Sequence, residues 1–411
     1  MSGDAAAAVT GDRIAAARDA AADIVRRTPV VPSATLTELA GAEVWLKAEN
    51  LQRTGSFKIR GALARLAALG DGCQAGVVCA SAGNHAQAVA LAAHERGIPC
   101  EVVMPAGAPV GKVEATEALG ATVTLSDGSV IDAIAVAQQR ASGAGLSFVH
   151  PFDDADVICG QGTLGLELLE QLPAAATVVV PAGGGGLLSG VAVAMKHERP
   201  DLRVVGVQAE AAPALAASLR SGTLEPAPAG PTIADGIAVG APSELTLELA
   251  RRWVDDCVTV SDDEIADAMV LLAEKAKLVV EAGGAVGVAA LASGRIDPRG
   301  EPVAVVLSGG NVDPGLLAEI ARRGESTAGR RHVLFTRIAD RPGGLARVLG
   351  LVAGAGANLV DITHLREGIG LHVAETGVQL VMETRSRAHA AEVIAALEAA
   401  GYDVSSAPTV S

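Results

Sequence analysis

Aromatic residues and cysteines are scarce in this chain of 411 residues. Phe, Trp and Tyr make up 2% of it, whereas 50% of its residues are hydrophobic and most of these are small. Small apolar side chains favour helices packed closely on a buried parallel sheet, whose strands are short, continuous apolar runs. The five cysteines are odd in number and never spaced as Cys-x-x-Cys, which argues against a disulfide framework and a zinc site; they are Cys73, Cys79, Cys100, Cys159 and Cys257.

Positive charge and long apolar runs are also lacking. The net charge is −15 without any basic patch, so we expect neither nucleic acid nor an anionic membrane as a partner. No stretch approaches about eighteen uninterrupted apolar residues, so we expect no membrane span. The opening segment, MSGDAAAAVTGD, carries an acidic residue where an export signal has basic ones. Together with the unpaired cysteines, this composition predicts a protein of the reducing cytoplasm.

Strands, loops and helices alternate through most of the chain. The predicted strands lie at 77–80, 100–104, 122–125, 178–180, 203–208 and 303–307, with helices between them. Such alternation predicts an α/β fold with parallel sheets and right-handed crossovers. We expect one α/β unit over residues 1–322 in two lobes, the smaller at about 51–148. A loop rich in Pro and Gly, 227–240, is long enough to cover a site.

The pattern changes after a polar segment. RGESTAGRR (323–331) is small, polar and charged, which is typical of a linker. Beyond it, over 332–411, the predicted elements are strands at 332–338, 358–366, 376–382 and 402–404 and helices at 343–355 and 388–399. Their order, β-α-β-β-α-β, is that of the ferredoxin-like fold, so we expect a second domain there.

The stretch KAENLQRTGSFKIRGA (47–62) sets one lysine among apolar residues. Lys58 lies between Phe57 and Ile59, directly after a Thr-Gly-Ser cluster that interrupts any helix. A lysine that loses hydration gives up its proton more readily, and its neutral amine can condense with a carbonyl as a Schiff base. The alternative is an ordinary lysine whose stem packs on apolar surface while its amine reaches water.

Four consecutive glycines, 183–186, separate a predicted strand from a predicted helix. Consecutive backbone N–H groups in such a loop can turn toward one anion at the helix N-terminus. A flexible linker is the alternative. The G-x-G-x-x-G spacing of dinucleotide sites fails, because the sixth position is Leu188 counted from Gly183 and Ser189 counted from Gly184. One phosphate is therefore favoured over two.

Two further loops follow predicted strands in the same way. SAGNH (81–85) offers N–H groups to a carboxylate, together with an amide and an imidazole, although His85 alone is as readily a structural cap. SGGN (308–311) adds a neutral hydroxyl. Open α/β sheets bind ligands at the carboxyl ends of their strands. A phosphate loop, a Schiff-base lysine, a carboxylate loop and a serine hydroxyl together indicate a pyridoxal phosphate site.

Four motifs in order, TGSFKIRGA (54–62), SAGNHAQ (81–87), GGGGL (183–187) and SGGN (308–311), resemble those of the threonine dehydratases, or threonine ammonia-lyases. These are fold-type II pyridoxal phosphate enzymes, and the resemblance covers nearly all of 1–322. It implies a two-lobed catalytic unit like the tryptophan synthase β subunit. DRPGGL (340–345) is similar to the strand-to-helix turn of ACT domains. This similarity implies a regulatory domain that binds an amino-acid effector, and isoleucine is the effector we expect.

The resemblance implies a role for each motif. Lys58 would bind the cofactor as a Schiff base and then remove the Cα proton of the substrate. Asn84 would hydrogen-bond the ring hydroxyl, Ser308 would meet the pyridine nitrogen, and Phe57 would flank the ring. The substrate carboxylate would lie among Ser81, Asn84 and His85. The residues that would hold the phosphate are Gly183, Gly184, Gly185, Gly186 and Leu187.

Three positions qualify the resemblance. Serine racemases have a second serine at the position of Ala82, so alanine argues against efficient racemisation. Glu210 falls where some relatives bind a cation, but Leu215 and Ala216 replace the acidic residues expected nearby. We therefore expect no metal, and Glu210 is otherwise a solvated strand end. Glu281, in EAGGA, belongs either to the cofactor cavity or to a helix N-terminus.

The activity that the resemblance implies is β-elimination from threonine to 2-oxobutanoate and ammonia, and from serine to pyruvate. A serine-specific dehydratase or a β-replacement enzyme is one alternative. A catalytically silent amino-acid sensor is another. We expect a homodimer or homotetramer with a small-molecule substrate.

Overall fold

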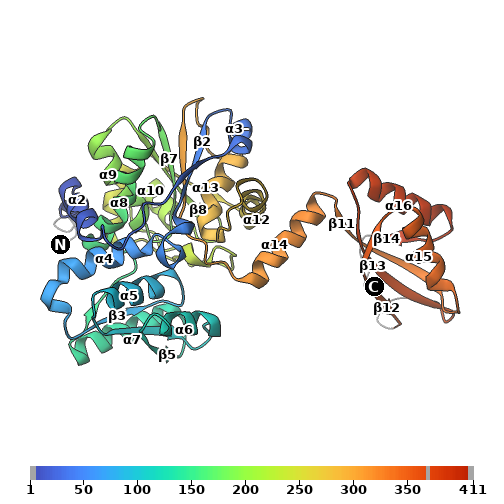
Figure 1. Cartoon of the computed structure of the whole chain (residues 1–411), viewed down its shortest axis with the longest axis horizontal. Coiled ribbons are helices and arrows are strands. Elements are labelled where there is room, and N and C mark those ends of the chain that lie inside the picture. Colours follow the sequence, from blue (N-terminus) through green and yellow to red (C-terminus); the bar gives the residue numbers. More distant parts are fainter. Residues whose placement is uncertain (1–5, 367–370, 406–411) are drawn as a thin grey trace. The chain divides into compact units, whose positions relative to one another are not determined.

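The computed structural model describes residues 6–366 and 371–405. The chain divides into two compact units, Met1–Val312 and Asp313–Ser411, both drawn in Figure 1. In the described part of the chain, no helix combines the length and apolar character that a bilayer crossing requires.

The larger sheet of the N-terminal unit has six strands in the order β1-β2-β10-β7-β8-β9. Neighbouring strands are parallel except β1, which is antiparallel to β2. The bounds are β1 (Val30–Pro32), β2 (Val44–Ala48), β7 (Thr177–Pro181), β8 (Arg203–Ala209), β9 (Asp256–Val260) and β10 (Val303–Leu307). Every residue of β7 and β10 is buried, as continuous apolar strands predict.

Helices cover both faces of this sheet, since successive side chains of a strand point to opposite faces. Val178 and Val180 share a core cluster with α8 and α9, whereas Val179 faces Gly287 of α13. The helices of this lobe are α2 (Gly11–Ala20), α3 (Ala34–Ala40), α8 (Ala155–Gln171), α9 (Gly186–Glu198), α10 (Ala214–Ser221), α11 (Glu244–Trp253), α12 (Asp262–Leu271) and α13 (Ala282–Ala292), with short turns η1 (Glu49–Leu51), η2 (Arg53–Gly55), η4 (Asp235–Ile237) and η5 (Leu272–Ala276).

The smaller lobe is built on a second parallel sheet in the order β5-β4-β3-β6. Its elements are α4 (Lys58–Leu69), η3 (Gly70–Cys73), β3 (Val77–Ala80), α5 (Asn84–Glu95), β4 (Cys100–Pro105), α6 (Val110–Glu117), β5 (Thr122–Ser126), α7 (Val130–Ala144) and β6 (Ser147–Phe148). One core cluster joins β3 and β4 to α4 and α5, and another joins them to α7. The two-lobed α/β unit with parallel sheets is confirmed (Figure 1).

The C-terminal unit contains a four-stranded antiparallel sheet in the order β12-β13-β11-β14. Its elements are α14 (Pro314–Thr327), β11 (Arg331–Ala339), α15 (Gly344–Gly354), β12 (Asn358–Leu365), β13 (Glu375–Glu383), α16 (Arg387–Ala399) and β14 (Val404–Ser405). One core of β11, β13, α15 and α16 residues holds it together. From β11 onward the order β-α-β-β-α-β and the sheet order confirm the predicted ferredoxin-like arrangement.

Several predicted boundaries were wrong. The linker expected over 323–331 begins inside α14, whose N-cap Asp313 accepts from the N–H groups of Gly315 and Leu316. Ala, Arg and Glu in this segment favour helix, so only 328–330 connect α14 to β11. Apolar residues at helical spacing after Thr10 predict a helix that reaches about Arg26, but α2 ends at Ala20. The predicted elements also omitted α10, α11 and β9, which lie between β8 and α12.

Candidate active site

Lys58 is the first residue of α4, and its half-buried side chain points toward Pro151. Its amine donates a hydrogen bond to the carbonyl oxygen of Pro151 at 2.8 Å and lies 5.2 Å from the centre of the Phe57 ring. Burial lowers the pKa of the Lys58 amine to about 8, while the negative charge of Glu281 opposes that shift. A substantial fraction of the amine is therefore neutral at mildly alkaline pH.

The loop before Lys58 is joined by its backbone to the loop after β10. The N–H of Phe57 donates to the oxygen of Ser308 at 3.1 Å, and the N–H of Gly310 donates to the oxygen of Gly55 at 2.9 Å. Gly55 has φ of 72°, and a Cβ there would lie 2.5 Å from the side-chain oxygen of Asn311. These contacts bring Ser308, which is buried, beside Phe57 and Lys58.

The loop after β3 reaches the same place through Asn84. Asn311 donates from Nδ2 to the side-chain oxygen of Asn84 at 2.7 Å, and Asn84 donates from Nδ2 to Glu281 at 2.7 Å. Ser81 accepts from the N–H of Gly83 at 3.0 Å, which shapes the turn. Asn311 Nδ2 also donates to the backbone oxygen of Thr54, so three of the predicted motifs meet at Asn311.

His85 points elsewhere. Its ring is buried and Nε2 donates to the oxygen of Val149, 2.9 Å away in the smaller lobe. Burial and the charge of Lys58 lower the pKa of His85 to about 3, so the imidazole is neutral. The group that His85 can offer to a carboxylate is its backbone N–H in the first turn of α5, where helix N–H groups have no intrahelical acceptor.

The glycine loop lies between β7 and α9, as predicted. Among the described residues, no hydrogen-bond acceptor faces the N–H groups of 183–187, whereas Ala182 before them donates to Val207. A Cβ on Gly184 would lie 2.6 Å from the Phe152 ring, and Gly185 has φ of 94° with Thr246 3.0 Å from a Cβ. Five adjacent free donors in a loop that excludes side chains at these positions fit one phosphate group.

Pro151 and Phe152 connect the lysine to the glycine loop. The oxygen of Pro151 accepts from the Lys58 amine, and the next residue, Phe152, packs against Gly184 and Gly186. The amine and the free N–H groups thus lie on two sides of one dipeptide. An aldehyde that carries a phosphate fits this arrangement, which supports the prediction of pyridoxal phosphate.

The loop predicted to cover the site, 227–240, contacts the glycine loop and the start of α13. Ile237 of η4 lies 3.1 Å from a Cβ placed on Gly183 and 3.3 Å from one placed on Gly283. On the same loop, Asp235 forms an ion pair with Lys112 of α6 at 3.7 Å. The covering loop therefore touches the glycine loop, α13 and the smaller lobe.

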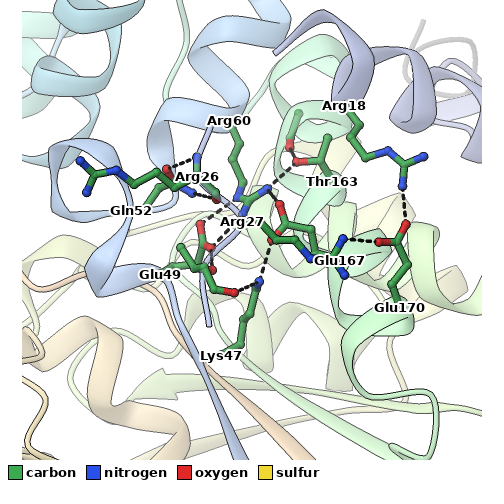
Figure 2. A network of polar contacts seen from close by, with 12 residues as sticks. Arg18, Arg26, Arg27, Lys47, Glu49, Gln52, Arg60, Thr163, Glu167 and Glu170 are labelled. Atoms are coloured by element: carbon green, nitrogen blue, oxygen red, sulfur yellow. Dashed lines mark hydrogen bonds and ion pairs between the residues drawn. The ribbon is translucent and has the colours of Figure 1, made fainter. Parts of the chain in front are cut away.

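Helix α4 is anchored from behind by a buried ion network (Figure 2). Arg60 donates to Glu49 at 2.8 Å and to Glu167 at 2.7 Å, and Lys47 donates to Glu167 at 2.6 Å. The side chains of Arg60, Glu49 and Lys47 are at most 1% exposed. Because Arg60 is two residues after Lys58, the network holds the start of the helix that carries the amine.

Sequence reasoning missed part of the site. No local pattern in the sequence pointed to Pro151, Phe152 or the ion network behind α4, because each depends on contacts between distant segments. Glu281 was left with two interpretations; it is the N-cap residue of α13, makes no side-chain capping bond, and accepts a hydrogen bond from Asn84. Glu210 pairs with Arg295 at 3.3 Å, and Arg295 also pairs with Glu264 at 3.2 Å.

Comparison with known families agrees with this site. Residues 21–309 match the family described as pyridoxal-phosphate dependent enzymes, and residues 332–401 match the ACT domain. The chain belongs to the pyridoxal-phosphate dependent enzymes and carries a C-terminal ACT domain. The predicted fold type, cofactor and regulatory-domain class are confirmed.

Individual relatives narrow the class. The chain is 46% identical to the L-threonine ammonia-lyase of Thermotoga maritima over 397 residues, which cover 96% of this chain and 99% of the relative. Among solved structures, maize serine racemase has a TM-score of 0.74 at 38% identity, covering 78% of this chain and 99% of that one. The processed form of threonine deaminase isoform 2 from Solanum lycopersicum has a TM-score of 0.72 at 34% identity, covering 75% of this chain and 90% of that one. The match to the threonine ammonia-lyase thus spans both units.

Proposed function

We propose that the protein is a pyridoxal phosphate-dependent threonine ammonia-lyase that converts L-threonine to 2-oxobutanoate and ammonia, and L-serine to pyruvate and ammonia. The observation that carries the proposal is the Lys58 amine, held by Pro151 beside a loop of free N–H groups. A threonine ammonia-lyase is 46% identical over nearly the whole chain, which favours this activity over that of the racemase with the similar fold.

The residues divide the work as follows. Bound pyridoxal phosphate withdraws electrons from the substrate's Cα, which acidifies the Cα–H bond and allows the β-hydroxyl to leave. The N–H groups of 183–187 would hold the phosphate, and Asn84 would donate to the ring hydroxyl. Burial lowers the pKa of Lys58 to about 8, so its neutral amine is available to take the Cα proton.

Ser308 distinguishes elimination from transamination. It is 3% exposed at the carboxyl end of β10, and its hydroxyl can hydrogen-bond a pyridine nitrogen without giving it a full positive charge. With a weaker electron sink, loss of the β-hydroxyl would be favoured over the proton return that transamination requires. Lys58 would return the proton taken from Cα to the leaving hydroxide, which departs as water. Hydrolysis of the resulting enamine would give the oxo acid and ammonia.

The C-terminal unit gives the enzyme its regulation. We place the catalytic domain at 1–322 and the regulatory domain at 332–411, ranges that contain the two family matches. The regulatory domain binds an amino-acid effector, for which we expect isoleucine. Control by isoleucine would connect the enzyme to isoleucine biosynthesis. We expect a homodimer or homotetramer in the cytoplasm.

The test is turnover of threonine and serine by the purified holoenzyme, measured as oxo acid and ammonia released in equal amounts. Lys58→Ala should lower kcat by at least about 10⁴-fold, because it removes both the cofactor's attachment and the base. Lys275→Ala, at an exposed lysine of η5, is the matched control. Unchanged turnover in Lys58→Ala, or an oxo acid formed without ammonia, would refute the proposal.

A further inference from the structure

The amide of Asn84 is held at both ends. Its Oδ1 accepts from Asn311 Nδ2, and its Nδ2 donates to Glu281 Oε1, both at 2.7 Å. Asn311 Nδ2 also donates to the backbone oxygen of Thr54 at 2.7 Å. A carbonyl oxygen only accepts, so Thr54 fixes which end of Asn311 faces Asn84. An ionised carboxylate likewise only accepts, so Glu281 selects the nitrogen end of Asn84.

Glu281 is itself fixed in place. Its N–H donates to the oxygen of Gly309 at 3.0 Å, and it precedes the first turn of α13. A Cβ on Gly309 would lie 2.3 Å from Glu281 Oε1 and 3.2 Å from Asn84 Nδ2. The backbone of the SGGN loop therefore packs directly against the hydrogen bond between Asn84 and Glu281.

We propose that Glu281 is a positioning residue that fixes the Asn84 amide so that its second Nδ2 hydrogen is the group offered to the phenolic oxygen of pyridoxal phosphate. The amide has four hydrogen-bonding positions, and Asn311 and Glu281 use one on each end. The remaining N–H is a donor that matches a phenolate. A rotated amide would set its oxygen against the Glu281 carboxylate and its nitrogen against the Asn311 nitrogen, which pairs two acceptors and two donors.

The protonation of Glu281 gives the inference a measurable signature. Burial raises the pKa of Glu281 to about 7, and the charge of Asp235 adds to the effect. The hydrogen bond from Asn84, the charge of Lys112 and the N–H of Asn311 oppose it, and the Lys58 amine also interacts with it. Below this pKa the carboxyl carries a proton and can donate, so Glu281 no longer reinforces the orientation that Asn311 gives the Asn84 amide.

The inference rests on the proposed cofactor, so the test uses two probes. Pyridoxine 5′-phosphate has an alcohol in place of the aldehyde and forms no covalent bond to Lys58. Its 3-deoxy analogue lacks the phenolic oxygen. The affinity of the apoprotein for each probe is measured by fluorescence titration from pH 6 to pH 8.5 for the wild type, Glu281→Ala, Glu281→Gln and the control Glu248→Gln, an exposed glutamate of α11.

At pH 8 the wild type and Glu248→Gln should prefer the hydroxylated probe by about tenfold, the value expected for one charge-assisted hydrogen bond. This preference should fall toward pH 6, since protonation removes the selection. Glu281→Ala should show a preference of less than about threefold. Glu281→Gln can donate as well as accept, like the protonated carboxyl, and it does not titrate, so its preference should be reduced and independent of pH in this range.

The two failures are distinguishable. If the wild type binds neither probe, the cofactor assignment and the inference both fall. If it binds pyridoxine 5′-phosphate but Glu281→Ala keeps the wild-type preference, the cofactor stands and Glu281 has no positioning role. If Glu281→Ala does not fold, Glu281→Gln decides, because a wild-type pH dependence in that variant would overturn the inference.

Discussion

Replacing Arg60 by methionine should destabilise the N-terminal unit far more than any surface change of the same kind. Arg60 gives Glu49 two hydrogen bonds, at 2.8 and 2.9 Å, and Glu49 is fully buried (Figure 2). Without the guanidinium, Lys47 is the one cation left for Glu167 and Glu49 in the described network, and Glu49 keeps a hydrogen bond from the hydroxyl of Thr28. Leaving one buried charge uncompensated costs about 3–5 kcal/mol, which is the loss expected for Arg60→Met.

Arg27→Met is the matched control. Arg27 pairs with Glu170 at 2.7 Å, but its side chain is 56% exposed, and such pairs contribute about 0–1 kcal/mol. Urea unfolding of the apoproteins measures both losses. The two tryptophans of the chain, Trp45 in β2 and Trp253 in α11, lie in the N-terminal unit, so their fluorescence reports on that unit. A loss for Arg60→Met within about 1 kcal/mol of the control would refute the reasoning.

The same pair of variants has a predicted pH dependence. Burial acts to raise the pKa of Glu49, but the charge and hydrogen bonds of Arg60 outweigh it and hold that pKa below its usual range. A carboxyl with a lowered pKa contributes stability above its unfolded pKa, and this is lost as the pH falls through its folded pKa. The wild type should therefore lose stability in acid below the ordinary glutamate pKa, while Arg60→Met loses less. The difference between them should narrow as the pH falls.

Three further predictions concern the site and its regulation. Gly184→Ala drives a Cβ into the Phe152 ring, so cofactor affinity should fall by about tenfold or more, whereas Gly143→Ala, with open space around its Cβ, should leave affinity unchanged. Because burial lowers the pKa of Lys58 to about 8, reductive methylation of this amine in the apoprotein should rise with a midpoint near pH 8; a midpoint near the ordinary lysine value of about 10 would contradict the burial argument. A chain that ends at Gly329 should keep threonine turnover but lose its response to isoleucine, and unchanged inhibition would place the effector site elsewhere.

The sequence alone determined those features that depend on neighbouring residues. Buried parallel strands are apolar throughout, so Val178-Val179-Val180 was recognisable as a strand without knowledge of its partners. The glycines of 183–186 were predicted to form an anion loop because a strand precedes them and an apolar helix follows, and both elements are present. The setting of Lys58 and the change of period after 331 are equally local. These signals were enough for the fold class and the cofactor.

The tertiary structure decided which of these segments meet. Asn84 and Glu281 are 197 positions apart, and only the topology of the two sheets brings their side chains to 2.7 Å. Arg60, Glu49 and Lys47 resemble solvated charges in the sequence, yet they are buried because each one supplies the counter-charge of another. Charge pairing over such separations has no periodicity along the chain, so the network behind α4 and the orientation of Asn84 became visible only in the folded protein.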